Sequence, residues 1–174
     1  MNAKDKRILY DRALQRIGGL IEGETDLIAV MATVVCELHN NFDYFHWTGF
    51  YRVVEPRLLK VGPYQGTHAC LRIAFDKGVC GAAASSRKTQ MVSDVREFPG
   101  YIVCSPSTRS EIVVPVTDPE GNLIAVLDID SDQTSAFDEV DKVNLEHLCV
   151  MMGSIGSEDR SHDITSDGDR SESI

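Results

Sequence analysis

The sequence has no excess of basic residues and no long hydrophobic run. Its 174 residues include 17 lysines and arginines against 27 aspartates and glutamates, which gives a net charge of -10. Because proteins that bind nucleic acids or anionic membranes present a basic face, this balance argues against both kinds of partner. No apolar segment approaches the roughly 20 residues that a membrane-spanning helix needs. A small substrate or a protein partner remains.

A secretory signal is also missing, since residues 1–10 are polar and charged and lack a hydrophobic segment. We therefore expect a cytoplasmic protein, in which disulfides are usually transient, catalytic or sensory. The five cysteines are an odd number, which a purely structural disulfide framework does not favour. No pair of them has the C-x-x-C spacing of common zinc sites, so we expect neither a metal nor another cofactor.

The composition, 43% hydrophobic and 25% charged, is typical of a globular protein, and we expect a single domain over residues 1–153. Residues 154–174 contain six acidic residues against two arginines and almost nothing apolar. Such a segment buries too little surface to offset its ordering entropy, so we expect a disordered acidic tail.

Apolar spacing predicts helices first, short strands next and a helix at the end, which is an α+β order. The first helix covers residues 5–21, the second begins with Thr25 as its N-cap, and the last covers residues 138–152 after a capping-box-like start at 135–138. The turn at 118–121 predicts an antiparallel hairpin. The predicted strands cover residues 45–53, 58–61, 71–75, 89–92, 112–116 and 123–129.

Three cysteines lie in two unusual stretches, Cys70 and Cys80 in the first and Cys104 in the second. Free cysteines most often behave as small buried hydrophobic residues, and spacing alone favours that interpretation. Their surroundings favour reactivity instead. Gly78 and Gly81 allow a tight turn beside Cys80 that a ligand can approach, and Cys104 lies in a loop bounded by glycine and proline.

Several short motifs together closely resemble the free methionine-(R)-sulfoxide reductases, which are enzymes with a GAF fold. The separations of the three cysteines fit the same family, and the resemblance covers residues 5–152. It implies a central antiparallel sheet of about six strands flanked by N-terminal and C-terminal helices. The motifs are WTGFYR (47–52), GPYQG (62–66), ACLRI (69–73), KGVCG (77–81), FPG before a cysteine (98–104), SEIVVP (110–115) and VLDID (126–130).

This resemblance implies an oxidoreductase that reduces free L-methionine-(R)-S-oxide through a cysteine sulfenic acid and an intramolecular disulfide. It assigns Cys104 as the nucleophile, Cys70 as the cysteine that resolves it, and Cys80 to a less fixed role nearby. A thioredoxin or a related dithiol protein would regenerate the thiols, and the chain is expected to form a homodimer. Cys36 and Cys149 lie in apolar helical positions outside the motifs, so we assign both to packing.

Asp128 and Asp130 alternate onto one face of a predicted strand, and Glu111 opens the neighbouring strand. Crowded carboxylates raise one another's pKa, so this set could protonate the sulfoxide oxygen or bind the substrate ammonium. An exposed strand end is the plainer interpretation of each acid taken alone. Trp47 and Tyr51 share a face of their strand, which predicts either core packing or an aromatic wall around the S-methyl group.

Residues 107–110 could donate hydrogen bonds to the substrate carboxylate, with Arg109 as the charged member of the set. Two other functions stay open from the sequence. One is a GAF module that senses a small molecule or redox state without turnover, and the other is an interaction scaffold whose cysteines are all structural.

Overall fold

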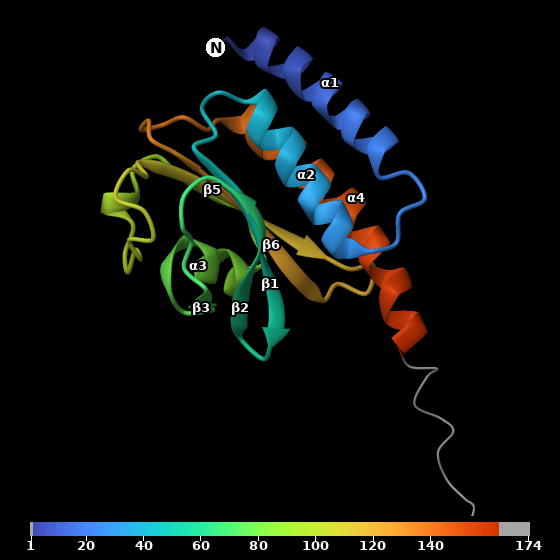
Figure 1. The fold of residues 1–174 in the computed structure, drawn as a ribbon. Coiled ribbons are helices and arrows are strands. Elements are labelled where there is room, and N and C mark those ends of the chain that lie inside the picture. Colours follow the sequence, from blue (N-terminus) through green and yellow to red (C-terminus); the bar gives the residue numbers. More distant parts are fainter. Residues whose placement is uncertain (1, 164–174) are drawn as a thin grey trace, which may run out of the picture.

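A six-stranded antiparallel sheet lies at the centre of the molecule (Figure 1). The structure, a computed structural model, describes residues 2–163. The strand order is β3-β2-β1-β6-β5-β4, and each neighbouring pair is antiparallel. This arrangement confirms the predicted sheet and its hairpin at 118–121. The strands are β1 (Trp47–Glu55), β2 (Leu58–Gln65), β3 (Arg72–Ala74), β4 (Gln90–Val92), β5 (Ser110–Thr117) and β6 (Leu123–Ser131).

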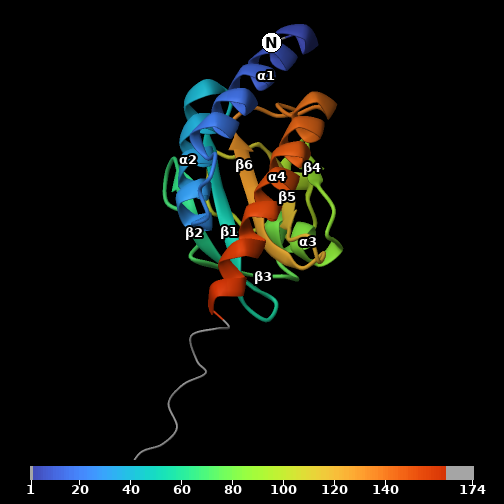
Figure 2. The ribbon, with the colours of Figure 1, turned by 90° about the vertical axis from the view of Figure 1, so that its right-hand side faces the viewer.

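Helices cover both faces of this sheet. Three of them, α1 (Ala3–Leu20), α2 (Leu27–Asn41) and α4 (Glu139–Asp163), lie on one side, with α1 outermost (Figures 1 and 2). The fourth, α3 (Gly78–Ser86), lies on the other side. The described part of the chain therefore has the α+β architecture that the sequence predicts.

Two apolar clusters fill the two faces of the sheet. Alternate residues of a strand point to opposite faces, so Ile112 and Leu127 join the larger cluster under α1, α2 and α4. Their neighbours Val113 and Val126 join the smaller cluster under α3, together with Cys80. The candidate site residues predicted from the sequence lie on the same side of the sheet as this smaller cluster.

The N-caps of two helices differ from the prediction. Asp26 caps α2 in place of Thr25, because its carboxylate accepts a hydrogen bond from the Ile28 N–H at 2.8 Å. At the start of α4, Asp138 Oδ1 accepts from the Val140 N–H at 2.8 Å, and the Asp138 N–H donates to Asp141 Oδ2 at 2.8 Å. Asp138 and Asp141 thus form the capping box, three residues after the predicted start at residue 135. The box forms at this position because the Asp141 carboxylate accepts the hydrogen bond of the Asp138 N–H.

The last helix is longer than predicted. α4 continues to Asp163 instead of ending at Met152, and Ile155 still packs against the larger cluster. Propagating a formed helix costs little per residue, and no proline interrupts residues 153–163. The predicted tail from residue 154 therefore begins inside α4, and residues 164–174 lie outside the described residues, so its disorder stays a prediction.

The two cysteines assigned to packing have different environments. Cys149 is 1% exposed, which confirms its assignment, whereas Cys36 is exposed. Val34, Val35 and Leu38 form the buried face of α2, and the helical turn of about 100° per residue carries Cys36 away from that face. Between residues 2 and 163, no helix combines the length and hydropathy that crossing a bilayer requires.

Candidate active site

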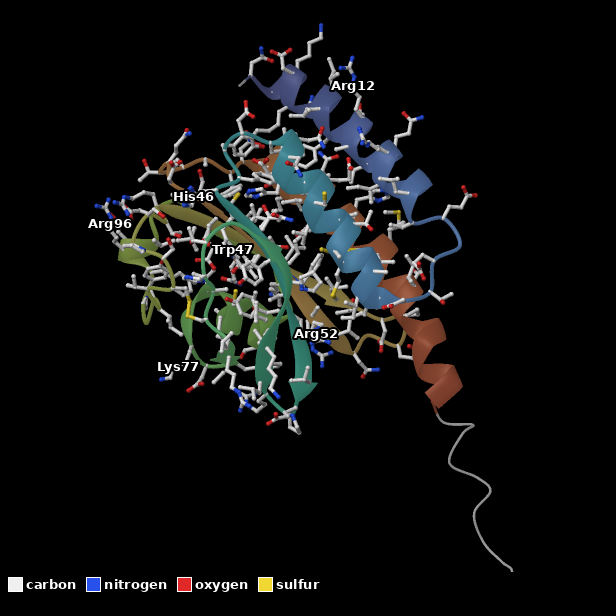
Figure 3. The ribbon with its side chains drawn as sticks, viewed as in Figure 1. Arg12, His46, Trp47, Arg52, Lys77 and Arg96 are labelled. Carbon is white, nitrogen blue, oxygen red and sulfur yellow. A yellow bond between two sulfur atoms is a disulfide. The ribbon has the colours of Figure 1, made fainter. Side chains whose placement is uncertain are left out.

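The two cysteine-containing stretches meet in space, where a disulfide joins Cys70 to Cys104. Cys70 lies in the loop between β2 and β3, and Cys104 lies in the loop before β5. The pairing implied by the family resemblance is thereby confirmed. Both residues are half-buried, so an external thiol can approach them. Figure 3 shows the bond in yellow on the side of the molecule that carries α3.

A cavity of about 30 Å³ lies beside this disulfide. A space of that size has room for about one or two water molecules. Residues from β1, α3, β5, β6 and the Cys104 loop form its wall, so the fold brings together side chains that are far apart in the sequence. Seven of the eight predicted site residues line the cavity: Trp47, Tyr51, Cys80, Cys104, Glu111, Asp128 and Asp130.

Three carboxyl groups converge on the cavity from neighbouring strands. Glu111 of β5 lies opposite Asp130 of β6, and Asp128 lies two residues from Asp130, so all three point to one face. Burial raises the pKa of Asp128 from 3.8 to about 7. Burial and the nearby Asp128 charge raise the pKa of Glu111 and of Asp130 well above their usual values. At neutral pH this cluster therefore holds protons that it can donate.

Cys80 of α3 packs directly against these acids. Its Sγ lies 3.9 Å from Glu111 Oε1, and the residue is 3% exposed. Burial raises the pKa of the Cys80 thiol, and the charges of Asp128 and Glu111 raise it further. A neutral thiol is a poor nucleophile, so this environment disfavours Cys80 as the attacking cysteine.

The glycines around Cys80 begin a helix, so the predicted tight turn is wrong. A Cβ on Gly81 would lie 2.5 Å from the carbonyl oxygen of Ala74, which means that α3 packs closely on the end of β3 only because residue 81 is glycine. Gly78 has a φ of +61°, a conformation that suits glycine where the chain enters the helix. The alanines that follow favour the helix, and they outweigh the glycine signal.

Aromatic rings form a second wall of the cavity. Trp47 and Tyr51 of β1 have ring centroids 6.0 Å apart, and Tyr64 of β2 stacks on Trp47 at 5.4 Å. Trp47 Nε1–H donates to the Thr67 carbonyl at 3.1 Å, which fixes the ring (labelled in Figure 3). A Cβ on Gly49 would lie 2.5 Å from the Trp47 ring, so the glycine makes space for this stack.

Comparison with known proteins decides the family. The model of the GAF domain family matches residues 24–155. This chain belongs to the GAF domain family. It is 43% identical over 143 residues to GAF domain-containing protein A of Dictyostelium discoideum, a match that covers 82% of this chain and 89% of that protein.

Within the GAF domain family, the chain is closely related to the free methionine-R-sulfoxide reductases. The enzyme of that name from Saccharomyces cerevisiae is 36% identical over 154 residues, covering 85% of this chain and 86% of its own. The solved structure of the free methionine-R-sulfoxide reductase from Neisseria meningitidis in complex with its substrate has a TM-score of 0.86 and 39% identity. That match covers 93% of this chain and 96% of the other.

Not every suggested donor for a substrate carboxylate faces the cavity of this GAF domain. Thr108 lines it. Arg109 Nη1 instead donates to the backbone carbonyls of Pro106 and Thr108 at 3.0 Å each, and Ser110 Oγ donates to the Gln133 carbonyl at 2.6 Å. Arg109 and Ser110 therefore hold the loop in shape, a role that local sequence could not distinguish from ligand binding.

Tyr101 and His46 are among the residues at the GAF domain site that were not identified from the sequence. Tyr101 lines the cavity, and its position close to Cys104 in the chain was the available signal. His46 Nε2 lies 2.9 Å from Ser107 Oγ, which lies 2.8 Å from Ser105 Oγ, beside Cys104 (His46 is labelled in Figure 3). This hydrogen-bonded chain fixes the Cys104 loop to the start of β1, a contact that no motif indicates.

Proposed function

We propose that this GAF domain reduces free L-methionine-(R)-S-oxide to L-methionine. The observation that carries the proposal is the Cys70–Cys104 disulfide beside a cavity lined by buried carboxyl groups. A redox pair alone can act as a switch, but sulfoxide reduction needs a thiol and an acid in one place. The named activity of the yeast and Neisseria relatives supports the same assignment.

The reaction begins when the Cys104 thiolate attacks the sulfoxide and an acid protonates the sulfoxide oxygen. The thioether leaves as methionine, and the oxygen stays on Cys104 as a sulfenic acid. The Cys70 thiol then attacks the Cys104 sulfur, which forms the disulfide and releases water. Two thiols are oxidised to one disulfide while one sulfoxide is reduced to one thioether.

The buried acids serve the proton-transfer step. Asp128, with a pKa near 7, holds a proton at physiological pH for part of the population, and burial also raises the pKa of Glu111 and of Asp130 well above their usual values. Carboxylates of the same cluster also suit the substrate ammonium. Trp47 and Tyr51 offer an apolar wall to the S-methyl group.

Reduction of the disulfide completes the cycle. We assign this step to a thioredoxin-type dithiol protein in the cytoplasm, since Cys70 and Cys104 are half-buried and within its reach. Breaking the bond also frees the Cys104 loop and lets the cavity widen from about 30 Å³ to fit an amino acid. An enclosed site would exclude methionine sulfoxide inside a polypeptide. The unit we propose is the domain at 1–153, acting as a homodimer.

Two substitutions separate the steps of this cycle. Cys104→Ser should lower steady-state turnover by about 10³-fold or more, because the nucleophile is lost. Cys70→Ser should keep a single turnover that ends in a sulfenic acid on Cys104. Product release is measured by chromatography with a thioredoxin system as reductant, and a dimedone adduct detects the sulfenic acid.

Cys36→Ser is the matched control, because Cys36 is exposed on α2 and lies outside the cavity. It should retain the wild-type rate. Turnover that survives in Cys104→Ser would remove the nucleophile assignment. Saturable binding of a small molecule by a wild-type chain that shows no turnover would support a sensor module instead.

A further inference from the structure

Three side chains of metal-ligand type meet beside the cavity, from three different elements. Cys80 lies on α3, Glu111 on β5 and Asp128 on β6, and one ligand atom of each lies within 4.8 Å of the others. The three residues are 3%, 5% and 6% exposed. No two of them are close in the sequence, so the cysteine spacing that argued against a metal could not reveal this group.

One atom of the group lacks a partner. Among the described residues, Oδ1 of Asp128 is buried and accepts no hydrogen bond. Buried acceptors are nearly always satisfied by protein, water or a bound group. Asp128 is part of the cavity wall, and the cavity has room for about one or two waters or a single ion. The unpaired oxygen therefore points to a ligand in this space.

The electrostatic environment of the cavity favours a cation. The acidic residues that line it are Glu111, Asp128 and Asp130. Among the described lining residues, the lysine is Lys77. The Lys77 side chain is largely exposed, and its Nζ lies 3.8 Å from Asp76 Oδ2. Buried carboxyl groups without a buried cation must hold protons, and a metal ion can replace those protons.

We propose that Cys80, Glu111 and Asp128 bind a thiophilic divalent cation such as Zn²⁺, with the fourth position open to the cavity. Tetrahedral Zn²⁺ holds sulfur at about 2.3 Å and carboxylate oxygen at about 2.0–2.2 Å, which places such ligand atoms roughly 3.4–3.6 Å apart. The separation of 3.9 Å between Cys80 Sγ and Glu111 Oε1 exceeds this by a few tenths of an ångström, and the three ligand atoms, all within 4.8 Å of one another, must draw together around the ion. Mg²⁺ and Ca²⁺ prefer more ligands, all oxygen, so the thiol selects against them.

A bound ion opposes the proposed reaction. It replaces the protons on acids that protonate the sulfoxide, and it occupies space that the substrate needs. Zn²⁺ is therefore a reversible inhibitor that competes with free methionine sulfoxide. This inhibitory consequence rests on the proposed function, whereas the binding of the ion does not.

Metal binding is measured on the full-length chain in its disulfide form, so that Cys70 and Cys104 cannot act as ligands. A Cys36→Ser background removes the exposed thiol. Co²⁺ is the probe, because a thiolate bound to Co²⁺ gives a charge-transfer absorption band. We expect one equivalent of Co²⁺ to bind with this band and with release of protons from the ligands, and Zn²⁺ then to displace the Co²⁺.

In this background, Cys80→Ser should abolish the band and weaken Zn²⁺ binding by at least about tenfold, and Asp128→Asn should weaken it similarly. Cys149→Ser is the matched control, because Cys149 is a buried thiol in the other cluster, and it should bind like the background. Circular dichroism checks the fold of each variant. If Cys80→Ser does not fold, a second measurement takes its place. Bound Zn²⁺ should protect Cys80 of the background protein from alkylation, and mass spectrometry identifies the cysteine that is protected.

The band's absence from the background protein would overturn the proposal, as would Zn²⁺ affinity unchanged by Cys80→Ser. Turnover of the reduced protein in a chelator tests the reductase separately. Turnover without metal binding refutes the metal site alone, and metal binding without turnover refutes the reductase alone. Inhibition by Zn²⁺ is measured as the turnover rate with Zn²⁺ divided by the rate of the same protein in chelator. This ratio should fall further for the Cys36→Ser protein than for the double variant Cys36→Ser, Cys80→Ser.

Discussion

Among the single residues of the cavity, Asp128 has a pKa close to neutral pH, since burial raises it from 3.8 to about 7. Two consequences follow. The protonated acid needed for sulfoxide reduction becomes scarcer as the pH rises through 7. The folded state also binds this proton more tightly than the unfolded state, so its contribution to stability is complete below about pH 4 and is lost as the pH rises through about 7.

Asp128→Asn tests both consequences. The variant should flatten the fall of Tm between about pH 4 and 7 and remove the decline of kcat/KM above about pH 7. Calorimetry and initial rates across this range are the measurements. Asp132→Asn is the matched control, because Asp132 is exposed just after β6 and should leave both profiles unchanged. A decline in kcat/KM that persists in Asp128→Asn would contradict the assignment.

The position of Gly49 allows a separate test of the aromatic wall. Its Cβ would lie 2.5 Å from the Trp47 ring and 2.5 Å from Tyr64 Cβ, so Gly49→Ala must displace the stack. We expect KM for free methionine sulfoxide to rise by roughly tenfold or less, with a stability loss of about 1–3 kcal/mol. Trp47 is the one tryptophan of the chain, so fluorescence reports its displacement directly.

Gly19→Ala controls for the added methyl group. A Cβ at Gly19 would meet no atom within 4 Å, and the position lies inside α1, where alanine is the better helix former. Its KM and fluorescence should equal those of the wild type. Unchanged KM and unchanged fluorescence in Gly49→Ala would show that Trp47 does not border the substrate.

At the scale of elements, a buried ion pair holds α1 to the rest of the domain. Lys6 of α1 is 4% exposed, and its Nζ lies 2.5 Å from Asp141 Oδ2 of α4. Asp141 Oδ1 also accepts hydrogen bonds from the hydroxyls of Tyr10 at 2.8 Å and Tyr44 at 2.6 Å. One carboxylate therefore connects α1, α4 and the segment before β1.

Lys6→Met should lower the free energy of unfolding by about 3–5 kcal/mol, because it leaves the Asp141 charge buried without its cation. Lys142→Met removes a partly exposed lysine that pairs with Glu139, and it should cost no more than about 1 kcal/mol. Urea denaturation measures both. Equal, small losses in the two variants would show that the Lys6 pair does not anchor α1.

The elements that could be predicted are those whose signal is local. The hairpin of β5 and β6 follows from alternating strands around a strong turn, and the sheet confirms it. By contrast, α3 was missed because its glycines resemble a turn, and the reason for Gly81 is a contact with Ala74 that only the folded chain contains. The cap of α2 was misplaced by one residue because Thr25 and Asp26 are neighbours and both residue types are good caps.

At the scale of the whole molecule, the fold assembles a site from residues that the chain separates widely. Motif resemblance predicted the Cys70–Cys104 pair, and together with strand alternation it named seven residues that line the cavity. It did not reveal the His46 contact with the Cys104 loop, nor the approach of Cys80 to Glu111, because both depend on how elements pack. Residue types could be predicted, and their mutual distances could not.

In the proposed reaction, one chain converts one free sulfoxide at the expense of its Cys70 and Cys104 thiols. The most direct measurement mixes reduced full-length protein with resolved R or S diastereomers of free methionine sulfoxide, without an external reductant, and counts methionine and thiols. We expect one methionine and two lost thiols per chain with the R form, a Cys70–Cys104 bond in the peptide map, and no change with the S form. An unchanged thiol count with the R form, or equal consumption of both forms, would contradict it.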